Sequence, residues 1–393
     1  MDTKKLRAWW FRRQGLDGEL RGQSASRVLA QTGWARSVGG AAPYLTLFSR
    51  GRLSREAVDA AVAGLEIHEL PAARGCTYVV PACDFALALR AASGSGDADL
   101  KTAYKLGVTD REIGKLCEAV RKALEKDALD PEEIRKATGT ASRSLGEEGR
   151  KKGLTTTLPL ALGKLQLTGE IRRTPVNGRL DQQRYRYCAW PRNPLEGSSA
   201  PPEEVASELA RRYFQWIGPA TVSEFQWFCG LGTKAARAAL EPLKLEAIAK
   251  DDPLLALPGD RERLEAFRVP KEARYALVAG LDGLGLLKRN TKELIDPEDM
   301  QAPLFRRKGF EGETPGDLPS HGIFDRGRLI GFWEYDTETE SIAWASFVAK
   351  NRDLLSAVEE TEQYVRRELG DARSFSLDSP KSRMPRLKAL RAG

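Results

Sequence analysis

The sequence predicts an α+β protein, with three tandem winged-helix units followed by a β-rich, barrel-like C-terminal domain. Residues 153–190 have the pattern of a helix followed by an arginine-rich hairpin, in which Asn177-Gly178 is a strong turn signal. Residues 203–257 show the same order of helices and a short hairpin. Residues 322–347 contain two strand patterns around a turn and then a third strand pattern.

The length and the charge of the chain limit the number of domains and the kinds of partner that we expect. The chain has 393 residues, a net charge of +7 and an isoelectric point near 9.1. This length predicts two to four domains. The positive charge favours an anionic partner, and the alternative is a basic protein without one.

The cysteine and histidine content argues against a metal site. The five cysteines have no CxxC spacing and the chain has two histidines, so we expect no metal and no other cofactor. A sparse, odd set of thiols is typical of a reducing cytoplasm. Because no apolar run is long enough to span a bilayer, we expect no membrane contact. We expect a cytoplasmic, nucleoid-associated monomer.

Residues 1–98 are the first predicted unit, although only the order of elements, and no internal repeat, indicates a winged helix there. Ser24 precedes an apolar helical pattern and is expected to cap it. Helices are expected over 4–14, 24–32, 54–62 and 83–92, an apolar element over 42–48 and a strand over 76–81. A Gly- and Ser-rich linker at 92–97 ends the unit.

Residues 99–192 are the second predicted unit. The sequence Thr109-Asp-Arg-Glu is a capping box that opens a helix to about residue 124. Asp130 before Pro131 marks the start of a second helix. The helix and hairpin of 153–190 complete the unit, and Pro159 allows that helix to start a few residues later.

The third unit, residues 202–257, follows a linker over 191–202. We expect helices over 203–217, 221–227 and 234–243 and a hairpin over 245–257, with a capping box at Thr221. Residues 258–393 are expected to form the β-rich domain. It ends with a helix over 353–369 and a basic tail that contains Lys381, Arg383, Arg386, Lys388 and Arg391.

The arginine-rich hairpin indicates contact with double-stranded DNA. Guanidinium groups can follow phosphates or enter a groove, and the preceding helix offers hydroxyl, ammonium and amide groups for phosphates and base edges. The predicted DNA-binding residues are Thr155, Thr156, Lys164, Arg172, Arg173, Arg179, Arg184 and Arg186. The alternative is a solvated hairpin with alternating arginines.

A loop in the first unit, residues 31–40, is a second candidate site. It combines three glycines with Trp34, Arg36 and Ser37. Glycines permit close approach of the backbone to a ligand, and an aromatic ring beside polar groups can hold an extruded base. The alternative is a loop that ends a helix and whose glycines serve packing. The isolated His68 is expected to be structural.

Several segments resemble a bacterial winged-helix family, the AlkZ/YcaQ-like DNA glycosylases. Residues 72–84 resemble its "RGTLHLVPAED" segment, and residues 216–231 resemble "GPATPADFAWWSGL". Residues 278–282 and 324–333 resemble "LPGYD" and "VDGRVVGTW". The family removes alkylated bases and unhooks crosslinks. The resemblance implies three winged helices, a barrel-like domain and a DNA substrate.

The resemblance also implies an active site in the first unit. The family's motif of Gln, a hydrophobic residue and Gln or Asp falls around residues 31–37, where Gln31 and Ser37 are the candidate catalytic residues because they can orient a water. The implied substrate-pocket residues are Gly33, Trp34, Arg36 and Tyr78. Tyr78 stands where the family has His, and Arg36 fits a phosphate contact.

Two functions therefore stay open. The first is a DNA glycosylase that acts on alkylated or crosslinked bases. The second is a non-catalytic winged-helix DNA-binding protein, either a lesion binder or a regulator, because the second polar position of the family's motif has no counterpart here.

Overall fold

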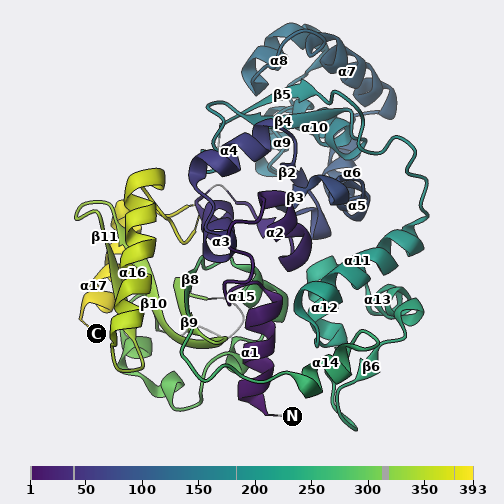
Figure 1. The fold of residues 1–393 in the computed structure, drawn as a ribbon. Helices are drawn as coiled ribbons and strands as arrows, with labels where there is room; N and C mark the ends of the chain where they lie inside the picture. The colour runs from purple at the N-terminus through teal and green to yellow at the C-terminus, as the bar shows by residue number, and fades with distance from the viewer. Residues whose placement is uncertain (1, 39, 183, 312–317, 376, 393) are drawn as a thin grey trace.

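The computed structural model describes residues 2–38, 40–182, 184–311, 318–375 and 377–392. Its fold is mixed α/β, with one three-stranded, one four-stranded and two two-stranded sheets among those residues. In Figure 1 the second unit lies at the top, the third unit at the lower right and the C-terminal sheet at the lower left. None of the described helices combines the length and apolar character needed to cross a membrane.

In the N-terminal part, helices surround a small antiparallel sheet. The sheet has the order β1-β3-β2. The strands are β1 (Ala35–Arg36), β2 (Ile67–Pro71) and β3 (Thr77–Pro81), and the helices are α1 (Thr3–Arg13), α2 (Ala25–Thr32), α3 (Ala42–Gly51), α4 (Arg55–Ala63) and α5 (Phe85–Ala91). Ser24 caps α2 by accepting from the Arg27 amide, which confirms that prediction.

The second unit contains the predicted helices and two that were not predicted, α6 and α9. Its elements are α6 (Asp97–Lys105), α7 (Asp110–Ala123), α8 (Pro131–Thr138), α9 (Gly146–Lys151), α10 (Leu158–Leu167), β4 (Ile171–Pro175) and β5 (Tyr185–Ala189). The capping box of Asp130 and Glu133 is complete. Helix α10 starts at Leu158, with Pro159 in its first turn, because the ring of proline is tolerated only there.

The connection between β4 and β5 is longer than predicted. A two-residue Asn177-Gly178 loop would place Val176 opposite Arg179. Instead the Val176 amide donates to the Arg184 carbonyl at 2.9 Å. The prediction of an Asn-Gly hairpin tip is therefore wrong, and these two residues form one turn of a larger loop.

The larger loop inserts Leu180 into another part of the protein. Leu180 is fully buried in a core cluster that also contains Tyr44 and Leu369. Its amide donates to Tyr44 Oη at 2.9 Å, and Arg179 Nη2 donates to the Leu369 carbonyl at 3.0 Å. The hairpin of the second unit is thus fastened at its tip to the first unit and to the C-terminal region.

The third unit follows the predicted order of elements. It contains α11 (Pro202–Ile217), α12 (Val222–Cys229), α13 (Thr233–Leu240), β6 (Glu246–Ala247) and β7 (Leu255–Ala256). The capping box of Thr221 and Glu224 is complete. The predicted helices and short hairpin are confirmed.

The C-terminal sheet is open, so the predicted barrel-like closure is wrong. Among the described residues its order is β11-β10-β9-β8, with β11 and β8 at its two edges. The strands are β8 (Tyr275–Val278), β9 (His321–Asp325), β10 (Arg328–Asp336) and β11 (Ser341–Ser346), and the helices of this region are α14 (Asp260–Ala266), α15 (Gly283–Lys288), α16 (Arg352–Tyr364) and α17 (Pro380–Arg391). Helices α16 and α17 pack on the sheet.

The segment predicted as a basic tail forms α17. Its arginines are held by carboxylates: Arg383 by Asp371, Arg386 by Glu334 and Arg391 by Asp336. Arg383 is also among the largest fully buried side chains. Much of the tail's positive charge is therefore used inside the fold.

A buried network joins the first unit, the third unit and the C-terminal region. The guanidinium of Arg50 in α3 makes two hydrogen bonds to Asp282, at 2.7 and 2.9 Å, and the two side chains are 1% and 0% exposed. Gln14, after α1, accepts from Arg50 at 2.8 Å and donates to the carbonyls of Thr32 and Trp216. Asp282, the acidic residue of segment 278–282, is therefore a structural residue.

His68 lies where the hairpin packs on β2. Its ring contacts the rings of Phe85 and Trp190, with centroids 6.3 and 5.1 Å away. Burial lowers the pKa of His68 to about 3, and the charges of Arg172 and Arg173 add to this shift, while a backbone contact with Arg173 opposes it. His68 is therefore neutral at physiological pH.

Replacing Asp282 by Asn leaves Arg50 buried without its counter-charge. We expect the free energy of unfolding to fall by about 3–5 kcal/mol, as for other buried pairs that lose one partner. Urea unfolding measures this loss. The exposed pair of Arg192 and Glu196 is the control, since Glu196→Gln should cost less than about 1 kcal/mol. Equal effects of the two changes would contradict the assigned role of Asp282.

His68 should make stability fall on acidification. The unfolded chain binds a proton near pH 6.5, whereas the folded chain resists it down to about pH 3, so stability is lost as pH falls through this window. One such histidine costs about 1.5 kcal/mol between pH 6.5 and 5. His68→Leu should flatten the curve of unfolding free energy against pH by this amount. An unchanged curve would count against the assignment.

Candidate functional site

The loop over residues 31–40 lies between α2 and α3, and Gly39 falls outside the described residues. Gln31 is in the last turn of α2 and its side chain is exposed. The described residues offer its carboxamide no hydrogen bond. Gln31 is therefore not brought together with the other candidate site residues.

Trp34 and Gly33 belong to an aromatic core. The indole of Trp34 is 6% exposed and donates to Asp84 Oδ2 at 3.0 Å. Its ring lies 5.3 Å from that of Trp216 and 6.1 Å from that of Tyr78. A Cβ on Gly33, whose φ is 106°, would lie 3.2 Å from the Trp216 ring. These contacts fit the alternative interpretation, in which the residues serve packing.

Ser37 makes a hydrogen bond to a buried carboxylate, that of Glu69 in strand β2. Its hydroxyl donates to Glu69 Oε1, and both side chains are buried. Tyr185 Oη donates to the same oxygen at 3.3 Å, and Arg173 Nη2 lies 3.2 Å from Glu69 Oε2. We call these four residues, Ser37, Glu69, Arg173 and Tyr185, the Glu69 cluster. Ser37 directly follows β1, Glu69 is in β2, and Arg173 and Tyr185 come from the two strands of the hairpin.

The Glu69 carboxylate is surrounded by a cation and by hydroxyl donors. Burying a charged carboxylate is costly unless donors compensate it, and Glu69 has a guanidinium and two hydroxyl groups. Burial raises the pKa of Tyr185 well above its usual value, and the charge of Glu69 raises it further. The phenol therefore stays protonated and remains a donor. Arg173 also lies 4.6 Å from the Tyr185 ring centroid.

Arg36 and Tyr78 lie beside the Glu69 cluster. Arg36 Nη1 donates to the Thr77 carbonyl at 3.1 Å, and its guanidinium lies 5.1 Å from the Tyr78 ring centroid. Burial raises the pKa of Tyr78 to about 12. Arg173 Nη2 contacts Thr77 Oγ1 at 3.5 Å. Two arginines therefore flank Thr77, next to Glu69.

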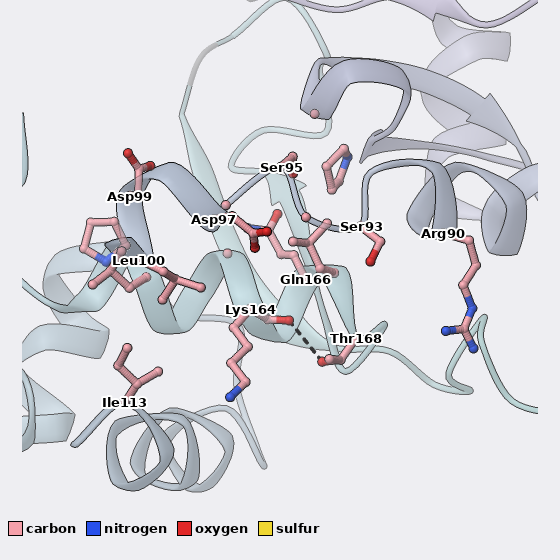
Figure 2. Close-up of a pocket in the computed structure, with 18 of the residues that line it drawn as sticks. Arg90, Ser93, Ser95, Asp97, Asp99, Leu100, Ile113, Lys164, Gln166 and Thr168 are labelled. Atoms are coloured by element: carbon pink, nitrogen blue, oxygen red, sulfur yellow. Dashed lines mark hydrogen bonds between the residues drawn. The ribbon is translucent and has the colours of Figure 1, made fainter. Parts of the chain in front are cut away.

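A cleft of about 770 Å³ opens beside this cluster, between the first and second units. Figure 2 shows it, with Lys164 and Gln166 on one wall and Asp97 and Asp99 at the start of α6. The cationic side chains that line it are Arg74, Arg90, Lys164 and Arg173. Arg173 thus belongs both to the cleft and to the Glu69 cluster.

Some of the predicted DNA-binding residues are exposed, and others are engaged in contacts within the protein. Arg184 and Arg186 are exposed on the hairpin, and Thr155 is exposed before α10. Thr156 is half-buried and pairs with Ser144 in an isolated bridge. Arg172 packs 5.7 Å from the Trp190 ring, and Arg179 is paired with Asp181.

Helix α10 is apolar along most of its length. Its buried residues are Leu158, Leu160, Ala161, Leu162 and Leu165. Lys164 is exposed, but it faces the cleft beside Gln166. Lys164 is therefore placed to meet a ligand of the cleft, and the rest of α10 mainly holds the second unit together.

Sequence reasoning missed Glu69 and Tyr185. One signal for Glu69 was present, because the strand Ile67–Pro71 places a carboxylate among apolar neighbours, and a buried carboxylate is almost always paired. Nothing local pointed to Tyr185, which reaches Glu69 through the packing of the hairpin on β2. The described residues contain no group of His, Cys, Asp and Glu side chains that could hold a metal ion.

Comparisons with known proteins agree with this architecture. The family model "DNA glycosylase AlkZ-like" matches residues 26–375. The solved structure of Streptomyces sahachiroi DNA glycosylase AlkZ is similar, with a TM-score of 0.66 and 22% sequence identity, over 95% of this chain and 98% of that one. At this identity the likeness shows the fold. No curated protein matches the chain. The match of the family model over nearly the whole chain shows that it belongs to the AlkZ-like family of DNA glycosylases and is a DNA glycosylase-like repair protein.

Proposed function

We propose that this protein hydrolyses the N-glycosidic bond of alkylated or crosslinked bases in duplex DNA, with Glu69 as the residue that activates water. The observation that supports this most directly is the buried Glu69 carboxylate, held by Ser37 and Arg173 beside a cleft that four cationic side chains line. The family supplies the reaction class.

The proposed architecture follows the predicted boundaries. Three tandem winged-helix units, residues 1–98, 99–192 and 202–257, carry the DNA, and residues 258–393 support them. Among the core clusters of the described residues, the one at 103–171 is confined to a single unit, whereas the other two extend across several units. We propose that the protein acts as a monomer on the DNA of the cytoplasmic nucleoid.

The protein needs to stabilise the sugar cation and activate a water, because the alkylated base is already a good leaving group. An N7-alkylated purine is cationic, so it leaves readily with the electron pair of its bond to C1′, and the sugar becomes an oxocarbenium-like cation. A carboxylate stabilises this cation and takes a proton from the water that attacks C1′. Glu69 supplies the carboxylate, and the Ser37 hydroxyl orients the water.

Arg173 connects substrate binding to this chemistry. Glu69 is 4% exposed in this state, so the Glu69 cluster must open before a sugar can reach it. Arg173 lines the cleft as well as pairing with Glu69. A DNA phosphate in the cleft competes for the guanidinium, since arginine binds phosphate bidentately. Movement of Arg173 towards that phosphate uncovers the carboxylate.

A non-catalytic DNA-binding protein, a lesion binder or a regulator, is the second candidate. The position of the predicted motif favours it, because Gln31 faces solvent and Trp34 and Tyr78 are buried in the core. This candidate predicts duplex affinity that falls steeply with salt and no release of a base.

Single-turnover release of an N7-alkylated purine from duplex DNA tests the proposal. Glu69→Gln keeps the size of the side chain but removes the base and the negative charge. We expect the rate to fall by about 10²–10⁴-fold, the usual contribution of acid–base catalysis, with little change in duplex affinity.

Gln31→Ala is the matched control in the predicted motif, and it should release the base at nearly the wild-type rate because Gln31 contacts none of the Glu69 cluster. Wild-type release by Glu69→Gln would rule out the assigned role of Glu69. Salt-dependent binding without release by the wild-type protein would establish the second candidate.

A further inference from the structure

The tip of the β2–β3 hairpin holds an arginine in an unfavourable backbone conformation. The Cys76 amide donates to the Ala73 carbonyl at 3.1 Å, and the two central residues of this turn, Arg74 and Gly75, have φ values of 58° and 67°. A type I′ turn needs positive φ at both positions and normally has Asn or Asp before Gly. Arginine has a Cβ that disfavours this conformation.

The side chain of Arg74 lies on Trp227 of the third unit. Its guanidinium carbon is 4.0 Å from the ring centroid, and Nη1 donates to the Trp227 carbonyl at 3.1 Å. A Cβ on Gly230 would lie 2.7 Å from Arg74 Cγ, so the glycine makes room for the arginine. Arg289, also at positive φ (52°), places its guanidinium 3.9 Å from the same ring. Two arginines from distant parts of the chain converge on one indole.

A second Arg-Gly turn in the same protein provides a comparison. Arg326 and Gly327 connect β9 to β10 and also have positive φ. Arg326 is paired with Asp325 at 2.8 Å and donates to the carbonyls of Pro270 and Lys271. Within the described chain, the partners of Arg74 are a carbonyl, a thiol and a ring, with no carboxylate among them. The exposed charge of Arg74 is therefore not neutralised by the fold.

We propose that Arg74 and Arg289, oriented by Trp227, form a phosphate-binding site for the backbone of duplex DNA. Strained residues persist where the surrounding structure fixes them, and they cluster at functional sites. A guanidinium that stacks on an aromatic ring keeps its edge N–H groups available for phosphate oxygens. This inference rests on the proposed action on DNA, but it concerns binding and not the chemistry at Glu69.

Neighbouring charges favour a long polyanion over a single small anion. Arg74 lines the cleft together with three other cationic side chains, although three aspartates also line it. Helix α13 starts shortly after Gly230, which contacts Arg74, and exposes Lys234 and Arg237. Cationic side chains thus occur both in the cleft and on a neighbouring helix, which suits a partner that carries several phosphates.

The salt dependence of duplex affinity tests the proposal. Arg74→Asn with Arg289→Asn removes both charges and places at both positions a residue that tolerates positive φ. We expect weaker binding to all duplex sequences and a smaller slope of log affinity against log salt, with a reduction of about 0.9 for each phosphate that loses its contact. Arg326→Asn is the matched control and should leave the slope unchanged.

A lysine pair controls for loss of folding. Arg74→Lys with Arg289→Lys keeps both charges and should retain the wild-type slope. The wild-type slope in a folded Asn double variant would overturn the proposal, as would an equal reduction in Arg326→Asn. A reduced slope in a protein that releases no base would support this site while contradicting the glycosylase proposal. Wild-type binding without salt dependence would overturn both.

Discussion

The relative placement of the units depends on the buried ion pair of Arg50 and Asp282. Removing both charges from water costs free energy, and this cost is offset only when the geometry satisfies the hydrogen bonds of both groups. Here that geometry requires α3, the start of α15 and the end of α1 to meet at one point, and Gln14 adds the carbonyls of Thr32 and Trp216. Thr32 ends α2, shortly before β1 and Ser37. The same network therefore helps to position the segment that carries Ser37.

The Glu69 cluster and the cleft both depend on contact between two units. Ser37 and Glu69 belong to the first unit, and Arg173 and Tyr185 belong to the hairpin of the second unit. The first unit supplies the carboxylate and one hydroxyl donor, and the second unit supplies the guanidinium and the phenol. Arg173 links the two features, because one guanidinium belongs to the carboxylate in the closed cluster and to the cleft that a duplex would enter. In the mechanism that we propose, binding of a phosphate by Arg173 and exposure of the carboxylate are one event.

Local features were predictable from the sequence, and features made by distant residues were not. Ser24 and the Thr221 capping box mark helix starts through contacts within four residues, so both were predicted correctly. Glu69 meets Tyr185 across more than a hundred residues, and no local pattern reports that meeting. The predicted turn at Asn177-Gly178 did not form the hairpin tip, because the larger loop buries Leu180 in a distant core. Strand patterns alone could not show that the C-terminal strands form an open sheet on which α16 and α17 pack.

The burial of Leu180 also has a consequence for the order in which the chain folds. The core cluster that contains Leu180 includes Tyr44, which is made early, and Tyr364 and Leu369, which are made late. Domains generally fold as they leave the ribosome, starting from the N-terminus. The packing partners of Leu180, however, are complete only after residue 369 has been added to the chain. During synthesis the hairpin of the second unit is therefore made before the contacts that hold Leu180 can all form.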